Sequence, residues 1–298
     1  MIENKSIKET RENSRDVNPV IITVILSLLV VIPQYGIGLI TAFILKHRLA
    51  ENFAEFIREN NLFFTLVIYS TAITLVLAYI FARKFLKRSN LSLGLVDFNK
   101  IKSYGKGILL GFGLLSIIVL LLRLTGFAEI IRNTKTFKLK LFLVFLPAWL
   151  IQGFEEEFLL RSILMNQMAA GGKIKVAIIA NSLIFSIFHL GNTGFNFMAF
   201  VNIFLVGLVF SIIFYLNGSI YTSAAAHSFW NMTMANIYGI TVSGNSPTGV
   251  TLFDTKLTGP TIISGGSFGI EGSIVTSLVL LVALIILIRK IKKPDFAN

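Results

Sequence analysis

Long apolar runs separated by short polar segments dominate this chain. Eight of them approach or exceed the length of about 20 residues that a helix needs to cross the hydrocarbon core of a membrane. Because the bilayer core offers no hydrogen-bond partners, each backbone group must be paired inside its own segment, as in a helix. The pattern therefore predicts an all-α, polytopic integral membrane protein with about eight transmembrane helices. We place these helices at about 20–45, 62–82, 105–122, 141–169, 174–190, 197–216, 219–238 and 269–288.

The polar segments divide the remainder of the chain. Residues 1–18 form a polar N-terminal tail, which we expect to be solvated, and residues 289–298 form a basic C-terminal tail. Residues 19–290 between them form a single membrane domain. Within it, segment 241–268 is rich in Gly, Ser and Thr and predicts an extramembrane loop. Its turn-forming residues favour a plain connection over a gate for substrate.

Composition and charge narrow the class of protein. The chain is 54% hydrophobic and 14% charged, with a mean hydropathy of +0.77, which excludes an ordinary soluble globular protein. The net charge of +12 does not indicate nucleic-acid binding, because the basic residues flank the apolar runs. Counted over alternate loops, Lys and Arg number 17 on one side and 9 on the other. The positive-inside rule then places both termini in the cytoplasm.

Ionisable residues within the apolar runs are concentrated on three helices. The fourth run carries Glu155, Glu156, Glu157 and Arg161, while the fifth carries His189 and the seventh carries His227. Such groups are costly at membrane depth, so each is a candidate functional residue. The chain has no cysteine, which excludes a thiol nucleophile, whereas carboxylate and histidine chemistry stays open.

Spacing predicts that the fourth and fifth runs bring a carboxylate and an imidazole together. Gly171 and Gly172 suit a tight turn between two antiparallel helices. Glu156 lies 16 residues before Gly172, and His189 lies 17 residues after it. At about 1.5 Å per residue the two side chains reach nearly the same depth, so they can face each other.

Helical periodicity separates the roles of the neighbouring glutamates. Glu157 and Arg161 are related by i, i+4, the spacing of a helical ion pair, whereas Glu156 points about 100° away. We expect Arg161 to neutralise Glu157, which leaves Glu156 free to act on water. His227 and Asn231 are also related by i, i+4 and share a helix face.

Three motifs in the same order give the sequence a resemblance to a known family. The chain is similar to the CPBP family, which contains CAAX prenyl proteases and bacteriocin-processing (Abi) proteins, across a catalytic core of about 141–238. The motifs are EExxxR at Glu156-Glu157-Phe-Leu-Leu-Arg161, FxxxH at Phe185-Ser-Ile-Phe-His189, and HxxxN at His227-Ser-Phe-Trp-Asn231.

The resemblance implies an intramembrane endopeptidase with eight helices. By analogy, Glu156 and His189 activate water, while His227 and Asn231 stabilise the oxyanion and Phe185 packs beneath them. The residue types leave the metal question open: Glu156, His189 and His227 could hold Zn²⁺, or could act as a metal-free set. No HExxH motif occurs in the sequence.

Two alternatives to a peptidase, a small-solute transporter and a non-proteolytic immunity or scaffold protein, are open at this point. We expect a membrane-associated or lipidated peptide or protein as the substrate and the lipid bilayer as a partner, but no nucleic acid. A bacterial plasma membrane is the expected location, with bacteriocin processing or self-immunity as the expected role. The side of access is open, because the family's sites generally face the cytosol, whereas the depth estimate for Glu156 favours the outer half.

Overall fold

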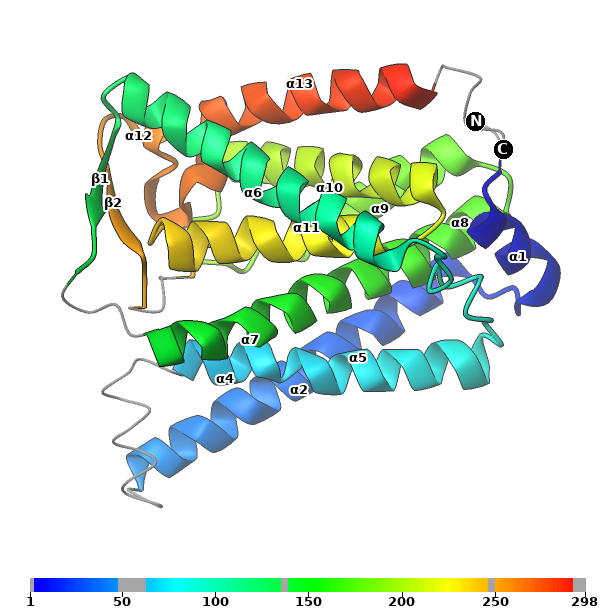
Figure 1. Cartoon of the computed structure of the whole chain (residues 1–298). Helices are drawn as coiled ribbons and strands as arrows, with labels where there is room; N and C mark the ends of the chain where they lie inside the picture. The colour runs from blue at the N-terminus through cyan, green and yellow to red at the C-terminus, as the bar shows by residue number, and fades with distance from the viewer. Residues whose placement is uncertain (1–2, 48–62, 135–138, 246–249, 292–298) are drawn as a thin grey trace.

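The structure, a computed structural model, describes residues 3–47, 63–134, 139–245 and 250–291. Each of the eight predicted runs is helical (Figure 1). In three of them the α-helix continues into a π-helix or a second α-helix. The helices are α2 (Pro19–Lys46), α4 (Phe63–Tyr69) with α5 (Thr71–Ile80) and η1 (Phe81–Phe85), α6 (Lys100–Leu124), α7 (Leu139–Glu157) with η2 (Phe158–Met165) and α8 (Asn166–Ala170), α9 (Ile174–Ile187), α10 (Phe197–Asn217), α11 (Tyr221–Met232) with η3 (Thr233–Ile237), and α13 (Ile274–Ile291).

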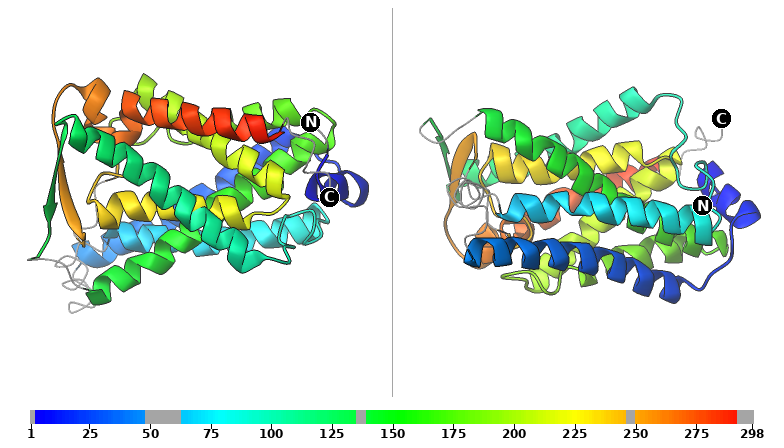
Figure 2. Two further views of the ribbon diagram at one scale, coloured as in Figure 1. Left: turned by 45° about the horizontal axis from the view of Figure 1, so that its top comes forward. Right: turned by 90° about the horizontal axis from the view of Figure 1, so that it is seen from below.

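The helices run back and forth along one long axis, and the two ends of the bundle differ (Figures 1 and 2). We call one end the terminal end, because the first and the last described residues of the chain lie there, together with the connection 86–99 and the turn 171–173. We call the other end the hairpin end. It carries the only two strands in the described part of the chain and segment 238–272.

Among the described residues, five helical segments are long and apolar enough to cross a membrane. They correspond to α2, α4–η1, α6, α10 and α13. The expected count of about eight spans is therefore not confirmed. Two helices fail for different physical reasons. Helix α9, with 14 residues, is too short to cross the bilayer core, and α7 ends in three consecutive glutamates, whose charges are costly in the membrane.

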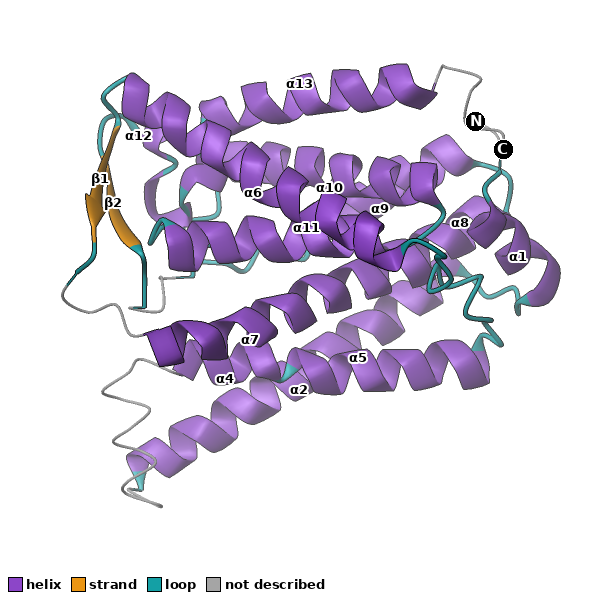
Figure 3. Ribbon diagram, viewed as in Figure 1, coloured by secondary structure: helices purple, strands orange, loops and turns teal. Residues whose placement is uncertain are grey.

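A small sheet at the hairpin end departs from the all-α expectation (Figure 3). Strands β1 (Ala128–Arg132) and β2 (Phe253–Leu257) pair antiparallel although more than a hundred residues separate them. Glu129 lies opposite Lys256 in this ladder, which places opposite charges in register. Segment 241–268 is thus partly structured, because β2 and the short helix α12 (Thr261–Ser264) lie within it.

The polar N-terminal segment is not a solvated tail. Residues Lys5–Asn13 form helix α1, which packs against α8 at the terminal end. Ile7 is fully buried, and the Asn166 side chain donates hydrogen bonds to Ser6 Oγ and to Ser92 O. The sequence prediction was wrong here because three small or apolar residues, Ser6, Ile7 and Thr10, suffice to bury one face of this short helix.

Small residues bring the central helix α11 close to two neighbours. Gly107 and Gly111, one helical turn apart on α6, face α11, and a Cβ at Gly111 would lie 2.1 Å from Ala226 O. On the other side, a Cβ at Gly153 of α7 would lie 2.4 Å from Ser228 Oγ. Close backbone approach through small residues is the usual way for helices to associate in membranes. It places His227, which lies between Ala226 and Ser228, in the centre of the bundle.

Candidate active site

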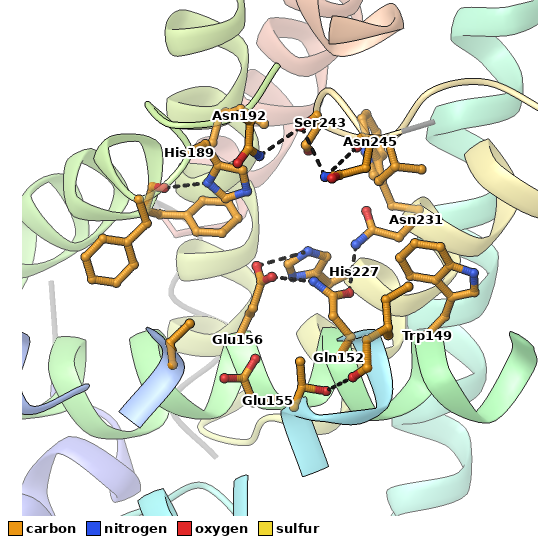
Figure 4. A pocket seen from close by; sticks show the side chains of 18 of the residues that line it. Trp149, Gln152, Glu155, Glu156, His189, Asn192, His227, Asn231, Ser243 and Asn245 are labelled. Atoms are coloured by element: carbon orange, nitrogen blue, oxygen red, sulfur yellow. Dashed lines mark hydrogen bonds and ion pairs between the residues drawn. The ribbon is translucent and has the colours of Figure 1, made fainter. Parts of the chain in front are cut away.

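A pocket of about 410 Å³ lies inside the bundle (Figure 4). The site residues predicted from the sequence line it together, from three different helical segments: Glu156, Phe185, His189, His227 and Asn231. Helices α2 and α4 supply an apolar wall that includes Val30 and Phe64. Gly172, at a φ of +84°, makes the predicted tight turn between α8 and α9.

Glu157 and Arg161 lie behind the pocket wall as a buried ion pair. Arg161 Nη1 is 2.8 Å from Glu157 Oε1, and both side chains are fully buried. The same carboxylate oxygen is 3.0 Å from Nδ1 of His227. Because a carboxylate can only accept, Nδ1 of His227 donates, which leaves Nε2 facing the pocket. The predicted pairing of Glu157 with Arg161 is confirmed.

Arg161 also joins its own helix to two others. Its Nη2 donates to Gly207 O at 3.1 Å, and its Nε lies 3.4 Å from Ser211 Oγ. The guanidinium stacks over the ring of Phe185 at 4.7 Å. A buried charge needs such complete pairing, since burial without partners is strongly destabilising. Arg161 therefore fixes the position of the motif helix.

Glu156 points into the pocket instead of toward the arginine. Gln152 Nε2 donates to its Oε1, and its Oε2 lies 3.7 Å from His227 Nε2. Its side chain is 25% exposed, in contrast to the fully buried Glu157. Gln152 also accepts a hydrogen bond of 2.9 Å from Asn231 Nδ2, so one amide links the carboxylate to the HxxxN motif.

His189 lies just beyond the end of α9, although the sequence prediction placed it within the helix. Its Nδ1 is 2.8 Å from Phe185 O, and because a carbonyl can only accept, Nδ1 donates and Nε2 is available to the pocket. The Phe185 ring meets the rings of His189 and His227 edge-on, at 4.8 and 5.8 Å. The histidine that pairs with Glu156 is His227, whereas the sequence prediction paired Glu156 with His189.

The three side chains considered for Zn²⁺ do not form a metal-binding group. Among the residues that the structure describes, no set of three His, Asp or Glu side chains is close enough to hold an ion. Nδ1 of His227 is engaged by Glu157, and its Nε2 faces Glu156. Glu156, His189 and His227 line one pocket without converging on a common point, so we derive no step through a metal.

The opposite side of the pocket comes partly from segment 241–268, which the sequence prediction treated as a plain connection, and partly from the start of the predicted helix 269–288. We call Glu156, Glu157, Arg161 and His227 the floor of the pocket, and residues 241–245 with 270–272 its roof. The roof is held by Glu271, which is only 4% exposed. Its carboxylate accepts from Trp230 Nε1 at 3.0 Å, from Ser243 N at 2.8 Å and from Ser243 Oγ at 2.7 Å.

The pocket contains further residues to which the sequence analysis gave no role, in addition to Glu155, which was one of its ionisable candidates. Asn192 Nδ2 donates to Ser243 O at 2.8 Å and ties the segment after α9 to the roof. Glu155 is 1% exposed and lines the same pocket as Glu156. Gln152 could have been found, because it lies one helical turn before Glu156. Glu271 carried no such signal, since its partners come from distant segments.

Comparison with known sequence families agrees with the motifs. Residues 138–233 match the family described as type II CAAX prenyl endopeptidase Rce1-like, and this range contains every motif residue from Glu156 to Asn231. A comparison with curated proteins gives no match. The matched family indicates a peptidase, and the described part of this chain contains five helices that are long and apolar enough to cross a membrane. Over residues 138–233, about a third of its length, the chain is thus similar to the Rce1-like family of type II CAAX prenyl endopeptidases.

Proposed function

We propose that the protein is an intramembrane endopeptidase in which Glu156 activates a water molecule to cleave a peptide bond. This proposal rests on one observation: two adjacent glutamates lie in different surroundings. Glu157 is neutralised by Arg161, whereas Glu156 faces the pocket with a neutral amide as its hydrogen-bond donor. A carboxylate without a bound counter-charge in a low-dielectric pocket is suited to accept a proton.

The gap between Glu156 and His227 suits a bridging water molecule. The 3.7 Å between Glu156 Oε2 and His227 Nε2 is too long for a hydrogen bond, but a water can lie within hydrogen-bond distance of both atoms. Glu157 holds the imidazole ring in the orientation that points Nε2 at this position. The water is then positioned before the substrate arrives, which lowers the entropic cost of the reaction.

The reaction follows from these positions. Water attacks the scissile carbonyl carbon while Glu156 takes one of its protons. Asn231 Nδ2, which has a second hydrogen beyond the one given to Gln152, stabilises the oxyanion. The tetrahedral intermediate collapses, the C–N bond breaks, and Glu156 returns its proton to the leaving amine. The products are a carboxylic acid and an amine, so a single water molecule is consumed.

We infer the substrate from the pocket walls and the family. The apolar wall from α2 and α4 faces the polar groups of the floor, so one extended peptide could contact both. A membrane-associated or lipidated peptide or protein meets this requirement. In a bacterial plasma membrane, processing of a bacteriocin or pheromone peptide, or self-immunity to a bacteriocin, would use the same activity.

Replacing Glu156 tests the proposal. With purified protein in detergent and a fluorogenic lipopeptide as the substrate, Glu156→Gln should lower kcat about 10²- to 10⁴-fold, because the general base is lost. Glu155→Gln is a matched control, since it removes the adjacent pocket carboxyl, and it should retain most of the activity. Equal rates for the parent and Glu156→Gln would contradict the proposal. Parallel assays with a chelator test whether a metal ion contributes.

A further inference from the structure

The pocket is built from only one end of the bundle. Every lining residue that lies in a connection comes from the hairpin end: Phe188, His189 and Asn192 follow α9, and Val242, Ser243, Asn245 and Glu271 lie between η3 and α13. Within the described residues, the connections of the terminal end, 86–99, 171–173 and 218–220, supply none of the lining. The loop-built side of the pocket therefore lies toward the hairpin end.

The positive charge gathers at the opposite end. Of the described Lys and Arg residues, 15 lie at or next to the terminal end: four in 5–15, seven in 83–106, two in 173–175 and two in 289–290. The hairpin end has five described basic residues, and over the whole sequence the two sets of loops carry 17 and 9. Strands β1 and β2 each carry one of these five together with one acidic residue, Glu129 or Asp254. The hairpin-end basic residues are Lys46, Arg123, Arg132, Lys140 and Lys256.

We propose that the pocket opens to the extracytoplasmic side of the membrane and takes a peptide that arrives there. Lys and Arg next to membrane spans are retained on the cytoplasmic side, which assigns the terminal end to the cytoplasm. The hairpin end, with the roof and the pocket, then faces outward. The statement that the occupant is a peptide substrate rests on the proposed function. The outward orientation opposes the cytosolic access that the family resemblance implies.

The assignment restricts the class of substrate. An outward-facing pocket receives an exported peptide, or the outer segment of another membrane protein, after either has crossed the bilayer. A chain that is prenylated and kept in the cytoplasm does not reach it. The reaction that supplies the substrate is therefore an export step, and the cleaved peptide is released on the outer side.

The absence of cysteine from the chain allows a direct test. Asn245→Cys places a thiol on an exposed residue that lines the pocket, and Thr258→Cys places a second one next to β2. Asn99→Cys is the matched probe at the terminal end, where the exposed side chain makes no capping hydrogen bond. Each variant is expressed in a bacterial membrane and treated with a membrane-impermeant maleimide in right-side-out and in inside-out vesicles. The cysteine-free parent gives the background, and labelling after detergent solubilisation gives the total.

We expect the Asn245 and Thr258 probes to be labelled at least tenfold more in right-side-out vesicles, and the Asn99 probe more in inside-out vesicles. The reverse pattern, or equal labelling of each probe from both sides, overturns the proposal. Labelling needs no hydrolysis, so its result is independent of the Glu156→Gln assay. An outward pocket without cleavage would refute the proposed function alone, and a cytosolic pocket with cleavage would refute this inference alone.

Discussion

The floor and the roof of the pocket each depend on one buried glutamate, but their carboxylates are satisfied in different ways. Glu157 in the floor is paired with the positive charge of Arg161 and with His227. Glu271 in the roof is surrounded by the N–H of Trp230 and by the N–H and hydroxyl of Ser243, which are all neutral. The floor is thus held by an ion pair along a single helix, and the roof by hydrogen bonds between distant segments.

This difference indicates how each region should respond to change. A buried ion pair that loses a single partner leaves a charge in a low-dielectric interior, which is among the costliest defects in a protein. Neutral donors that lose their acceptor can turn toward water if a pocket is near. Substitutions in the floor should therefore lower the stability strongly, whereas the side chains of the roof should rearrange and tolerate substitution better. Substitutions at four sites test this comparison, beginning with the largest expected effect.

The largest effect is expected in the floor. Arg161→Met should lower the free energy of unfolding by about 3–5 kcal/mol, because Glu157 then carries an unpaired buried charge. Thermal unfolding of the purified protein in detergent measures the loss. The double variant Arg161→Met with Glu157→Gln is the control, since it removes both charges and should recover part of the stability. A double variant less stable than the single one would show that the charge of Glu157 is not the cause.

The roof should give a smaller loss of stability and a clearer effect on substrate binding. Glu271→Gln keeps the shape of the side chain but offers one acceptor oxygen in place of two, so a donor of Ser243 or Trp230 loses its partner. We expect a loss of about 1–3 kcal/mol and a KM that rises more than kcat falls. Unfolding and steady-state kinetics measure these two quantities. A loss equal to that of Arg161→Met would remove the distinction between floor and roof.

The same distinction explains which features could be read from the sequence. The floor follows from helical spacing: Glu157 and Arg161 are one turn apart, and so are His227 and Asn231, so a linear pattern carries their geometry. The roof depends on contacts between residues far apart in the chain, such as Ser243 with Glu271. A pattern of turn-forming residues predicts a loop but not where the loop packs.

The ends of the helices and the short strands also could not be predicted from the sequence. The helical runs were placed correctly, since a membrane span requires a long apolar segment. The apolar pattern does not show that α9 ends before His189, because the residues that continue past the helix are equally apolar. Strands β1 and β2 were missed for another reason. Each has five residues, and each is stabilised only by pairing with the other.

The backbone of the roof offers a finer test than Glu271. Ser243 has a φ of +45°, a conformation that is strained for any residue with a Cβ and free for glycine. Ser243→Gly removes this strain and also removes the hydroxyl donor to Glu271, so the two effects should cancel to within about 1 kcal/mol. Ser243→Ala keeps the strain and loses the hydrogen bond, and should be less stable than Ser243→Gly. Equal unfolding temperatures for the two variants would show that the backbone strain at position 243 does not affect the free energy of unfolding.

An effect as small as that at Ser243 is expected at Asp97, a partly exposed carboxylate at the terminal end that, like Glu271, accepts from neutral donors. It accepts from Asn99 N at 2.7 Å, from Ser103 Oγ at 2.8 Å and from Ser219 Oγ at 2.9 Å, and so joins α6 to the turn before α11. Partial burial raises the pKa of Asp97, but the three hydrogen bonds and the charge of Lys100 together hold it below the usual value of 3.8. The ionised form is therefore the one that stabilises the fold.

The sign of the pH dependence follows from this lowered pKa. The folded protein binds the proton on Asp97 less readily than the unfolded chain does, so the stabilisation is complete above 3.8 and is lost as the pH falls through the lower, folded value. Asp97→Asn should cost about 1 kcal/mol at neutral pH, since water can replace part of each hydrogen bond at this exposed site. The difference in unfolding temperature between parent and variant should shrink at acidic pH. If the difference in unfolding temperature stays constant with pH, the side chain of Asp97 acts through its shape. Neutral donors would then stabilise a carboxylate only where it is buried, as at Glu271.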